Sequence, residues 1–325
     1  MIDKEFAIME QYECKVRQYS RGRGAFILDT DRGCVLLREY TKNGKRLETL
    51  AKLLDYLYEK GMNVDVLIKN KEGSYLSTDS EGNNFIVTRW SNGRECDIKN
   101  LQDICQALRT LALLHKNLEK YDCGNDDFQI ARSLSKEYDK HNRELKMIKN
   151  YLATKRNKND FELLAYSNCD YYLEEGIKAM DILAGSGYEE ELKRCAADRL
   201  LCHGNFNYHN IYFFQNQCEL CGFEQSYINL RLWDLYNFMR KLMEKCDWDI
   251  KMGYLMFHEY DKVYPLSAQA VKILGAMFAY PEKYWKLLNF YYNSNKAWIP
   301  AKSLEKLKKV LLQNTMRNAF VKTIC

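Results

Sequence analysis

The chain has 325 residues, of which 46% are hydrophobic, 13% aromatic and 29% charged. This composition is typical of a globular protein, and the 3 prolines and 16 glycines exclude a disordered or collagen-like chain. The 49 basic and 44 acidic residues give a formal net charge of +5, which permits an acidic partner but is too small to indicate nucleic-acid binding. The length allows about two domains.

Residues 1–90 are predicted to form mainly β-strands around one helix. Arg21-Gly22-Arg23-Gly24 interrupts the first strand region and is equally consistent with an ordinary strand turn and with a hairpin that covers phosphate groups. Lys45–Lys60 carries leucines on one face, which predicts an amphipathic helix that ends at Gly61. The predicted strand regions are residues 12–30, 33–40, 64–69, 75–77 and 84–90.

Helical periodicity dominates from Asp97 onward. An interruption at residues 200–223 has strand character and predicts a hairpin with its turn at Gln215-Asn216-Gln217. Helices resume at Leu232 and are punctuated by prolines. The helical segments before the hairpin are residues 104–115, 127–155, 160–183 and 188–198, and the prolines are Pro265, Pro281 and Pro300.

This order predicts an α+β protein with a small strand-rich N-lobe over residues 1–92 and a larger, mostly helical C-lobe over residues 93–325. We expect the lobes to meet near residues 92–94. The layout resembles that of protein-kinase-like phosphotransferases, in which the nucleotide lies between the two lobes. No internal repeat of 20–50 residues argues for a different architecture.

No stretch of about 18 apolar residues occurs, so the sequence predicts no membrane span. The start of the chain carries early acidic residues and no apolar segment, so we expect no secretory signal. The 12 cysteines are therefore expected to be reduced thiols in a cytosolic chain. Cys218 and Cys221 are weak evidence for a zinc site, and we expect half-buried thiols without zinc.

The loop over residues 201–211 resembles the catalytic loop of aminoglycoside and choline kinases, whose pattern is H-G-D-x-x-x-x-N. The resemblance implies a catalytic aspartate that accepts the substrate hydroxyl proton and an asparagine that binds magnesium. The chain keeps His203 and Asn210, but Asn205 replaces the catalytic aspartate. The second metal-binding aspartate of the family falls at Gly222.

The resemblance also implies that Asp234 braces this loop, that Arg38 stands for the lysine that holds the nucleotide phosphates, and that Glu48 is its partner on the helix. Asn205 removes the base, which typically lowers the rate about 10²–10⁴-fold. Gly222 removes the strong anionic ligand of a magnesium ion. The combination predicts a scaffold that has kept its loop and lost its reaction.

Alternatives stay open for three of these positions. His203 is either a residue of a working catalytic loop or a hydrogen-bonding brace of that loop. Asn210 is either a metal ligand or a turn cap. Glu224, two residues after Gly222, is a less favoured substitute for the missing metal ligand.

Five further segments carry a second resemblance: Gly93-Arg94-Glu95-Cys96-Asp97, Leu111-Ala-Leu-Leu-His115-Lys116, Phe278-Ala-Tyr-Pro281-Glu-Lys-Tyr-Trp285, Phe290-Tyr-Tyr292 and Lys296-Ala-Trp298. These segments resemble the CotS family of spore coat proteins from endospore-forming bacteria, over roughly residues 12–320. The resemblance implies a kinase-like coat component that needs no cofactor, with ATP and Mg²⁺ as ligands only if nucleotide binding is retained. It also implies assembly from the mother-cell cytoplasm into the spore coat, with other coat proteins as partners. The alternative is a small-molecule phosphotransferase with a non-standard metal site.

The chain has 24 tyrosines, which fits the resemblance because coat proteins are often rich in tyrosine, although core packing explains them equally well. Ser303–Phe320 is predicted to be an amphipathic helix whose basic face either docks an acidic partner or, more commonly, is simply solvated. The apolar positions of this helix are Leu304, Leu307 and Leu311, and the basic ones are Lys302, Lys306, Lys308, Lys309 and Arg317.

Overall fold

The computed structural model describes residues 7–22, 24–41, 44–293 and 301–325. The described chain forms two compact units, which combine Met1–Gln129 with Arg199–Asp234 and Ile130–Asp198 with Leu235–Cys325. The grouping differs from the lobes expected at residues 1–92 and 93–325. Strand β11 (Gln217–Leu220) of the hairpin pairs with β4 (Asn63–Val64), which follows α2 (Gly44–Glu59).

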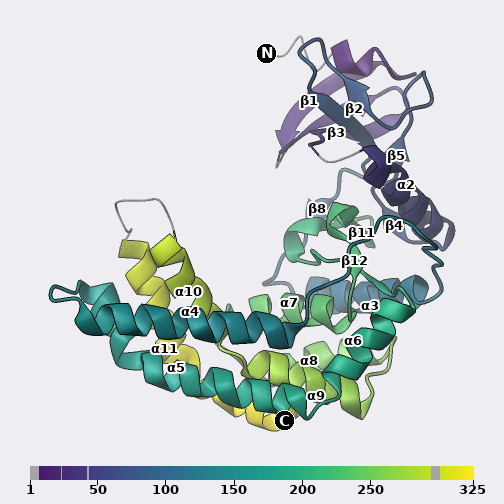
Figure 1. Cartoon of the computed structure of the whole chain (residues 1–325). Helices are drawn as coiled ribbons and strands as arrows, with labels where there is room; N and C mark the ends of the chain where they lie inside the picture. Colours follow the sequence, from purple (N-terminus) through teal and green to yellow (C-terminus); the bar gives the residue numbers. More distant parts are fainter. Residues whose placement is uncertain (1–6, 23, 42–43, 294–300) are drawn as a thin grey trace. The chain divides into compact units, whose positions relative to one another are not determined.

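An antiparallel sheet forms the N-terminal part of the first unit (Figure 1). Its strand order is β1-β2-β3-β7-β5, and β6 pairs with β7. Alternate residues of one face pack against the segment before β1, as the two-residue period of strands requires. The strands are β1 (Val16–Gly22), β2 (Ala25–Thr30), β3 (Gly33–Glu39), β5 (Leu67–Ile68), β6 (Ser77–Thr78) and β7 (Asn84–Arg89). The core residues of this face are Ile8, Met9, Tyr12, Leu28, Val35, Leu37 and Val87.

Helix α2 (Gly44–Glu59) lies beside this sheet (Figure 1). The leucines that predicted it, Leu47, Leu50, Leu54 and Leu57, are all buried. The helix ends one residue before the predicted Lys60, and Gly61 follows with a φ of +78°. Because this left-handed conformation favours glycine, the sequence located the end of the helix correctly.

A second, smaller sheet completes the first unit and has the order β4-β11-β10-β8. The strand predicted over residues 64–69 is wrong as a single element, because the chain turns after β4 and enters the other sheet as β5. The strand predicted over residues 75–77 is reduced to β6. The second sheet contains β4 (Asn63–Val64), β8 (Arg94–Glu95), β10 (Ile211–Phe214) and β11 (Gln217–Leu220), and it is accompanied by β9 (Leu201–Cys202), β12 (Tyr227–Ile228) and α3 (Leu101–Leu118).

The second unit consists mainly of helices, and α4 and α5 lie side by side in it (Figure 1). The helix predicted from residue 127 begins only at Leu134, whose backbone N–H donates to the hydroxyl of Tyr188 at 2.9 Å. Asn159 and Glu162 form a capping box that begins α5. The helices are α4 (Leu134–Thr154), α5 (Asp160–Ala184), α6 (Tyr188–Ala197), α7 (Leu232–Met243), α8 (Ile250–Asp261), α9 (Ala268–Ala279), α10 (Glu282–Asn293) and α11 (Ala301–Ile324).

Aromatic rings form much of the core of the second unit. Tyr138 stacks on Tyr280 with ring centroids 3.7 Å apart, and Tyr172 stacks on Tyr284 at 3.9 Å. Because Tyr280 and Tyr284 are buried in these stacks, the segment Phe278–Trp285 is part of the packed core.

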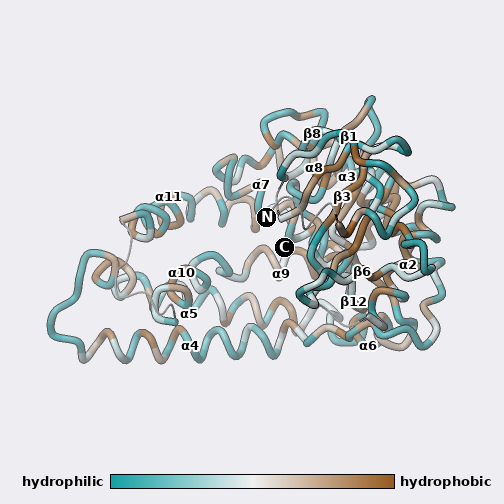
Figure 2. Tube along the Cα trace, turned by 90° about the horizontal axis from the view of Figure 1, so that it is seen from above, coloured by the Kyte–Doolittle hydropathy of each residue, from teal (hydrophilic) through white to brown (hydrophobic). Residues whose placement is uncertain are grey.

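Along α4 and α5 the tube alternates between hydrophilic and hydrophobic colours, as expected for helices that bury one face (Figure 2).

Helix α11 buries Leu307, and Lys302, Lys306, Lys308 and Lys309 are exposed as predicted. Arg317 is a correction, because it is buried and donates to the carbonyls of Phe278 and Ala279. These carbonyls belong to the last turn of α9, whose acceptors have no partner within the helix. The predicted features at Arg23, Lys296–Trp298 and Pro300 lie outside the described residues.

Candidate functional site

The loop that follows β9 turns sharply at Gly204, which has a φ of +78°. A Cβ atom at this position would lie 2.2 Å from the carbonyl oxygen of Gln225. Only glycine fits both the left-handed backbone and this close approach. The turn leads into a short 3₁₀ helix, Tyr208–Asn210, and then into β10.

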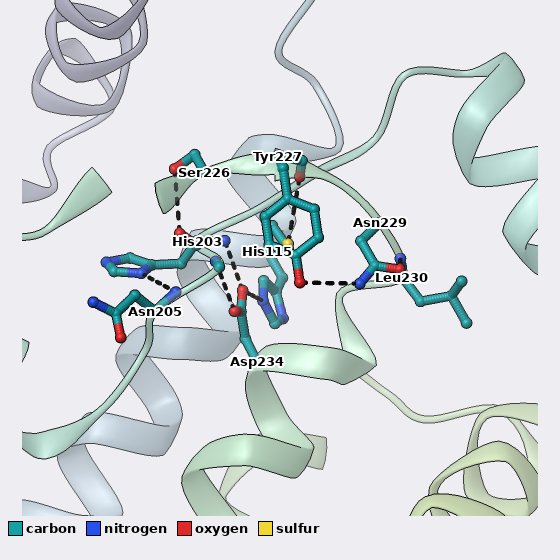
Figure 3. A network of polar contacts seen from close by, with 10 residues as sticks. His115, His203, Asn205, Ser226, Tyr227, Asn229, Leu230 and Asp234 are labelled. Carbon is teal, nitrogen blue, oxygen red and sulfur yellow. Dashed lines mark hydrogen bonds and ion pairs between the residues drawn. The ribbon is translucent and has the colours of Figure 1, made fainter. Parts of the chain in front are cut away.

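Asp234 holds the start of this loop (Figure 3). Its carboxylate accepts from the backbone N–H groups of His203 at 2.7 Å and Gly204 at 2.9 Å. The His115 ring on α3 approaches the same carboxylate through Nε2 at 3.3 Å. Asp234 is only 1% exposed. The bracing role predicted for Asp234 is confirmed, and His115 is a member that the sequence analysis missed.

His203 uses both ring nitrogens inside the loop. Nε2 lies 3.1 Å from the carbonyl oxygen of Cys221, and Nδ1 lies 3.2 Å from the backbone N–H of Asn205. Together these contacts define a neutral ring that donates through Nε2 and accepts through Nδ1. Burial lowers the pKa of His203, which also favours the neutral form. The geometry is that of a structural brace.

These buried histidines predict a loss of stability in acid. Because burial lowers the pKa of His115 and of His203, each contributes stability that is complete above about pH 6.5 and lost as the pH falls towards the folded-state pKa. We expect each to contribute about 1.4 kcal/mol per pH unit to this slope. Urea unfolding at pH 7.5, 6.5 and 5.5 measures it.

His203→Gln is expected to flatten this pH dependence, since glutamine offers a donor and an acceptor without titrating. His258 is exposed, so His258→Gln is the matched control and should leave the slope unchanged. Equal slopes in both variants would contradict the assignment.

Asn205, Asn210 and Gly222 lie together, as the motif predicts. The backbone carbonyl of Asn205 accepts from the side-chain amide of Asn210 at 2.9 Å. Gly222 has a φ of +88°, and a Cβ atom there would lie 2.7 Å from Nδ2 of Asn210. Asn205 is exposed and also accepts from the side chain of Asn207. The three positions lie close together in the fold, and none of them carries a carboxylate.

A magnesium ion does not fit these residues. Magnesium prefers hard anionic oxygen ligands, and the loop offers amide groups and a glycine. Across the described residues, no group of three or more His, Cys, Asp or Glu side chains could hold a metal ion. Burial raises the pKa of the Cys218 and Cys221 thiols, which opposes the thiolate form that a zinc ion would need. None of the 12 cysteines, all of which lie within the described residues, forms a disulfide.

Arg38 on β3 is held between two carboxylates, which we call the Arg38 triad. Its guanidinium lies 2.9 Å from Asp65 and 3.1 Å from Glu224. Asp65 is 2% exposed, so burial raises its pKa and the guanidinium opposes this rise. Glu48, the partner expected from the resemblance, is exposed on α2. The structure thus gives Arg38 two partners that differ from the one predicted.

Helix α2 is also tied to the segment that follows Gly222. The Arg46 guanidinium donates to the carbonyl oxygens of Glu224 at 3.1 Å and Ser226 at 3.3 Å. Gly222 precedes the 3₁₀ helix Phe223–Gln225 as its N-cap residue. This turn directs Glu224 towards Arg38.

The sheet face that carries Arg38 is also packed beyond the triad. Leu36 pairs with Thr88 across β3 and β7, so these residues share a face with Arg38. Two residues past Thr88, the ring of Trp90 packs edge-on against Tyr212 of β10 with centroids 4.4 Å apart. This contact joins the end of the first sheet to the second within the same unit.

Sequence reasoning missed His115, Asp65 and Arg46. Of these three residues, only Asp65 could have been suspected from the sequence. It stands between Val64 and Val66 and is therefore a charged residue in an otherwise apolar segment. Such a residue needs a partner when buried, but its identity depends on the fold.

The sheet, helix, loop and helical unit together define a protein-kinase-like fold of the aminoglycoside and choline kinase type. An aminoglycoside phosphotransferase from Alicyclobacillus acidocaldarius is similar with a TM-score of 0.85 and 17% identity, covering 98% of this chain and 94% of that one. A choline kinase from Cryptosporidium parvum Iowa II is similar with a TM-score of 0.57 and 15% identity, covering 98% and 96%. These likenesses confirm the predicted α+β kinase-like fold.

The sequence family described as "Spore coat putative kinase YutH" matches residues 5–324, and the chain belongs to this family. Spore coat protein S of Bacillus subtilis (strain 168) is 22% identical over 305 residues, which cover 92% of this chain and 86% of that protein. The predicted resemblance to spore coat proteins is confirmed. None of the helices in the described ranges is long and apolar enough to cross a membrane.

Proposed function

We propose that this protein is a structural component of the spore coat, built on a kinase-like scaffold that does not transfer phosphate. The observation that carries the proposal is the Arg38 triad. The cation that holds the nucleotide phosphates in such kinases is paired with one acidic residue, whereas Arg38 faces two carboxylates at ion-pair distance. The positive charge is thus neutralised from within the protein.

The catalytic loop supports the same proposal. Phosphoryl transfer depends on positioning and on neutralising charge with metal ions. Asn205 cannot accept a proton, and Gly222 offers no side chain to a metal. Asn210 retains an amide oxygen, but without a carboxylate beside it this oxygen is a single neutral ligand for a metal that prefers anionic oxygens. The residues that are retained are His203, Gly204 and Asp234. Their contacts stabilise the conformation of the loop and supply no catalytic group.

Membership of a spore coat family supports a place in the coat, with other coat proteins as partners and the mother-cell cytoplasm as the site of synthesis. A fluorescent fusion followed through sporulation tests this part. Signal that surrounds the forespore is expected. Signal that stays diffuse in the mother cell would contradict the assignment.

Activity tests the other part. We expect the unmodified protein to show no ATP turnover approaching the usual kinase range of about 1–100 per second. Neither Asn205→Asp nor Gly222→Asp alone should restore it, because one variant returns a base without a metal ligand and the other does the reverse. Turnover in that range by the unmodified chain would instead favour a small-molecule phosphotransferase with a non-standard metal site.

We also expect Gly222→Asp to be destabilising. Its Cβ atom would crowd the side chain of Asn210, and the aspartate would have to adopt a left-handed backbone conformation, which costs about 1–2 kcal/mol. Gly82 has a nearly equal φ of +86°, and a Cβ atom there would have no heavy atom within 4 Å. Gly82→Asp therefore measures the cost of the left-handed backbone without crowding. Thermal unfolding should show a larger loss for Gly222→Asp. Equal losses would refute the crowding at Asn210.

A further inference from the structure

A cavity of about 730 Å³ lies in the first unit, apart from the catalytic-like loop. It is bounded by the β2–β3 turn, the C-terminal end of α2, the segment of β4 and β5, the end of β7 and the tip of the β10–β11 hairpin. Among the described residues that line it, none is Arg38, His203, Asn205, Asn210 or Gly222. The cavity is therefore a candidate site of its own.

The cavity combines an apolar base with aromatic walls. Val35, Ile68 and Val87 contribute apolar surface from the sheet face that packs against the N-terminal segment. Tyr12, Tyr58, Trp90 and Phe214 contribute aromatic surface. The buried indole N–H of Trp90 has no hydrogen-bond partner, so this wall also holds an unused donor. The volume lies within the usual range for small-molecule sites, about 300–1,000 Å³.

The acidic groups that line the cavity are already paired. Glu13 forms an ion pair with Arg32 at 3.3 Å. Glu219 is buried and accepts from both the backbone N–H and the hydroxyl of Ser91. Lys71 donates to a backbone carbonyl of the N-terminal segment at 2.7 Å. These contacts hold the walls of the cavity together.

Two cations that line the cavity, Lys69 and Arg89, lie over aromatic rings rather than in ion pairs. The Lys69 ammonium lies 5.0 Å from the ring centroid of Tyr75, and the Arg89 guanidinium lies 5.3 Å from that of Tyr58. Within the part of the chain that the structure describes, neither has a carboxylate oxygen within 4.0 Å. Asp55 is near enough for both cations to lower its pKa, against a rise caused by burial, but it does not line the cavity. Positive charge is left available at this site.

We propose that the cavity binds a small organic anion that carries an aromatic ring. Lys69 and Arg89 would contact the anionic group, and the aromatic walls would contact the ring. A guanidinium and an ammonium bind a phosphate or a carboxylate alike, so the shared chemistry is an aromatic ring that carries an anionic group. The site is independent of the kinase-like loop and does not require magnesium.

Titration calorimetry without magnesium tests the proposal with AMP, phenyl phosphate and 4-hydroxybenzoate, and with adenosine and ribose 5-phosphate as the separate halves of AMP. We expect at least one aromatic anion to bind with a Kd below about 1 mM. If AMP binds, it should bind at least about tenfold more tightly than either half. The phosphate and carboxylate probes then distinguish the two anionic groups.

The double variant Lys69→Gln/Arg89→Gln is expected to weaken this binding at least about tenfold. Both side chains lie at the surface, and thermal unfolding verifies that the variant is folded. Lys60 also lies over a tyrosine ring, at 5.3 Å from Tyr56, but does not line the cavity, so Lys60→Gln is the matched control. Binding that survives the double variant, or no binding by any of the three aromatic anions, would overturn the proposal.

Discussion

Asp234→Ala is expected to destabilise the first unit by about 3–5 kcal/mol. The carboxylate is the common acceptor for the backbone N–H groups of His203 and Gly204, and it also contacts the buried ring of His115. Its removal leaves the buried N–H of His203 and the half-buried N–H of Gly204 without a partner, at about 1–3 kcal/mol for a buried group, and removes the contact to the imidazole. Few single substitutions act on so many buried groups at once.

Urea unfolding followed by circular dichroism measures the loss, and hydrogen exchange locates it. Amides over residues 201–211 should exchange faster in Asp234→Ala, whereas strands β1 to β3 should be less affected. Asp127 is exposed in the same unit, so Asp127→Ala is the matched control and should change stability by less than about 0.5 kcal/mol. Similar losses for the two variants would mean that Asp234 does not brace the loop.

Arg38→Met is expected to cost a similar amount, about 3–5 kcal/mol, because it leaves the buried carboxylate of Asp65 without its cation. The guanidinium side chain is 20% exposed and the Asp65 side chain 2%, so solvent screens this pair poorly. The loss of stability should come mainly from the unpaired buried carboxylate of Asp65 rather than from the lost attraction between Arg38 and Asp65. Arg38→Met/Asp65→Leu should therefore be more stable than Arg38→Met alone.

The matched control is the exposed pair of Arg32 and Glu13, whose side chains are 65% and 68% exposed. Arg32→Met should cost no more than about 1 kcal/mol, as surface ion pairs usually do. A double variant that is less stable than Arg38→Met would show that the triad itself supplies net stability. A small loss of stability in Arg38→Met would show that the two carboxylates do not hold Arg38 firmly, which would weaken the proposal of an inactive scaffold.

Much of the fold could be predicted because its causes are local. The leucines of α2 share one face of a helix, and Gly61 supplies the left-handed residue that ends it. The hairpin of β10 and β11 was predicted in the same way, from its polar turn between strand-like segments. The loop motif and Asp234 were recognised from residue spacing and from resemblance, and the structure brings them together.

Tertiary structure alone decided which charges meet. Arg38 and Asp65 are 27 positions apart, and Arg46 and Glu224 are 178 apart, so no local pattern connects them. Glu48 looked like the partner because it lies on the predicted helix, but the backbone turn at Gly222 presents Glu224 instead. Periodicity specifies which face of an element is buried, whereas the pairing of polar groups depends on the distances that folding creates. For that reason the sequence by itself predicted the fold, the family and the replaced residues of the loop, whereas the packing of the chain determined which carboxylates pair with Arg38.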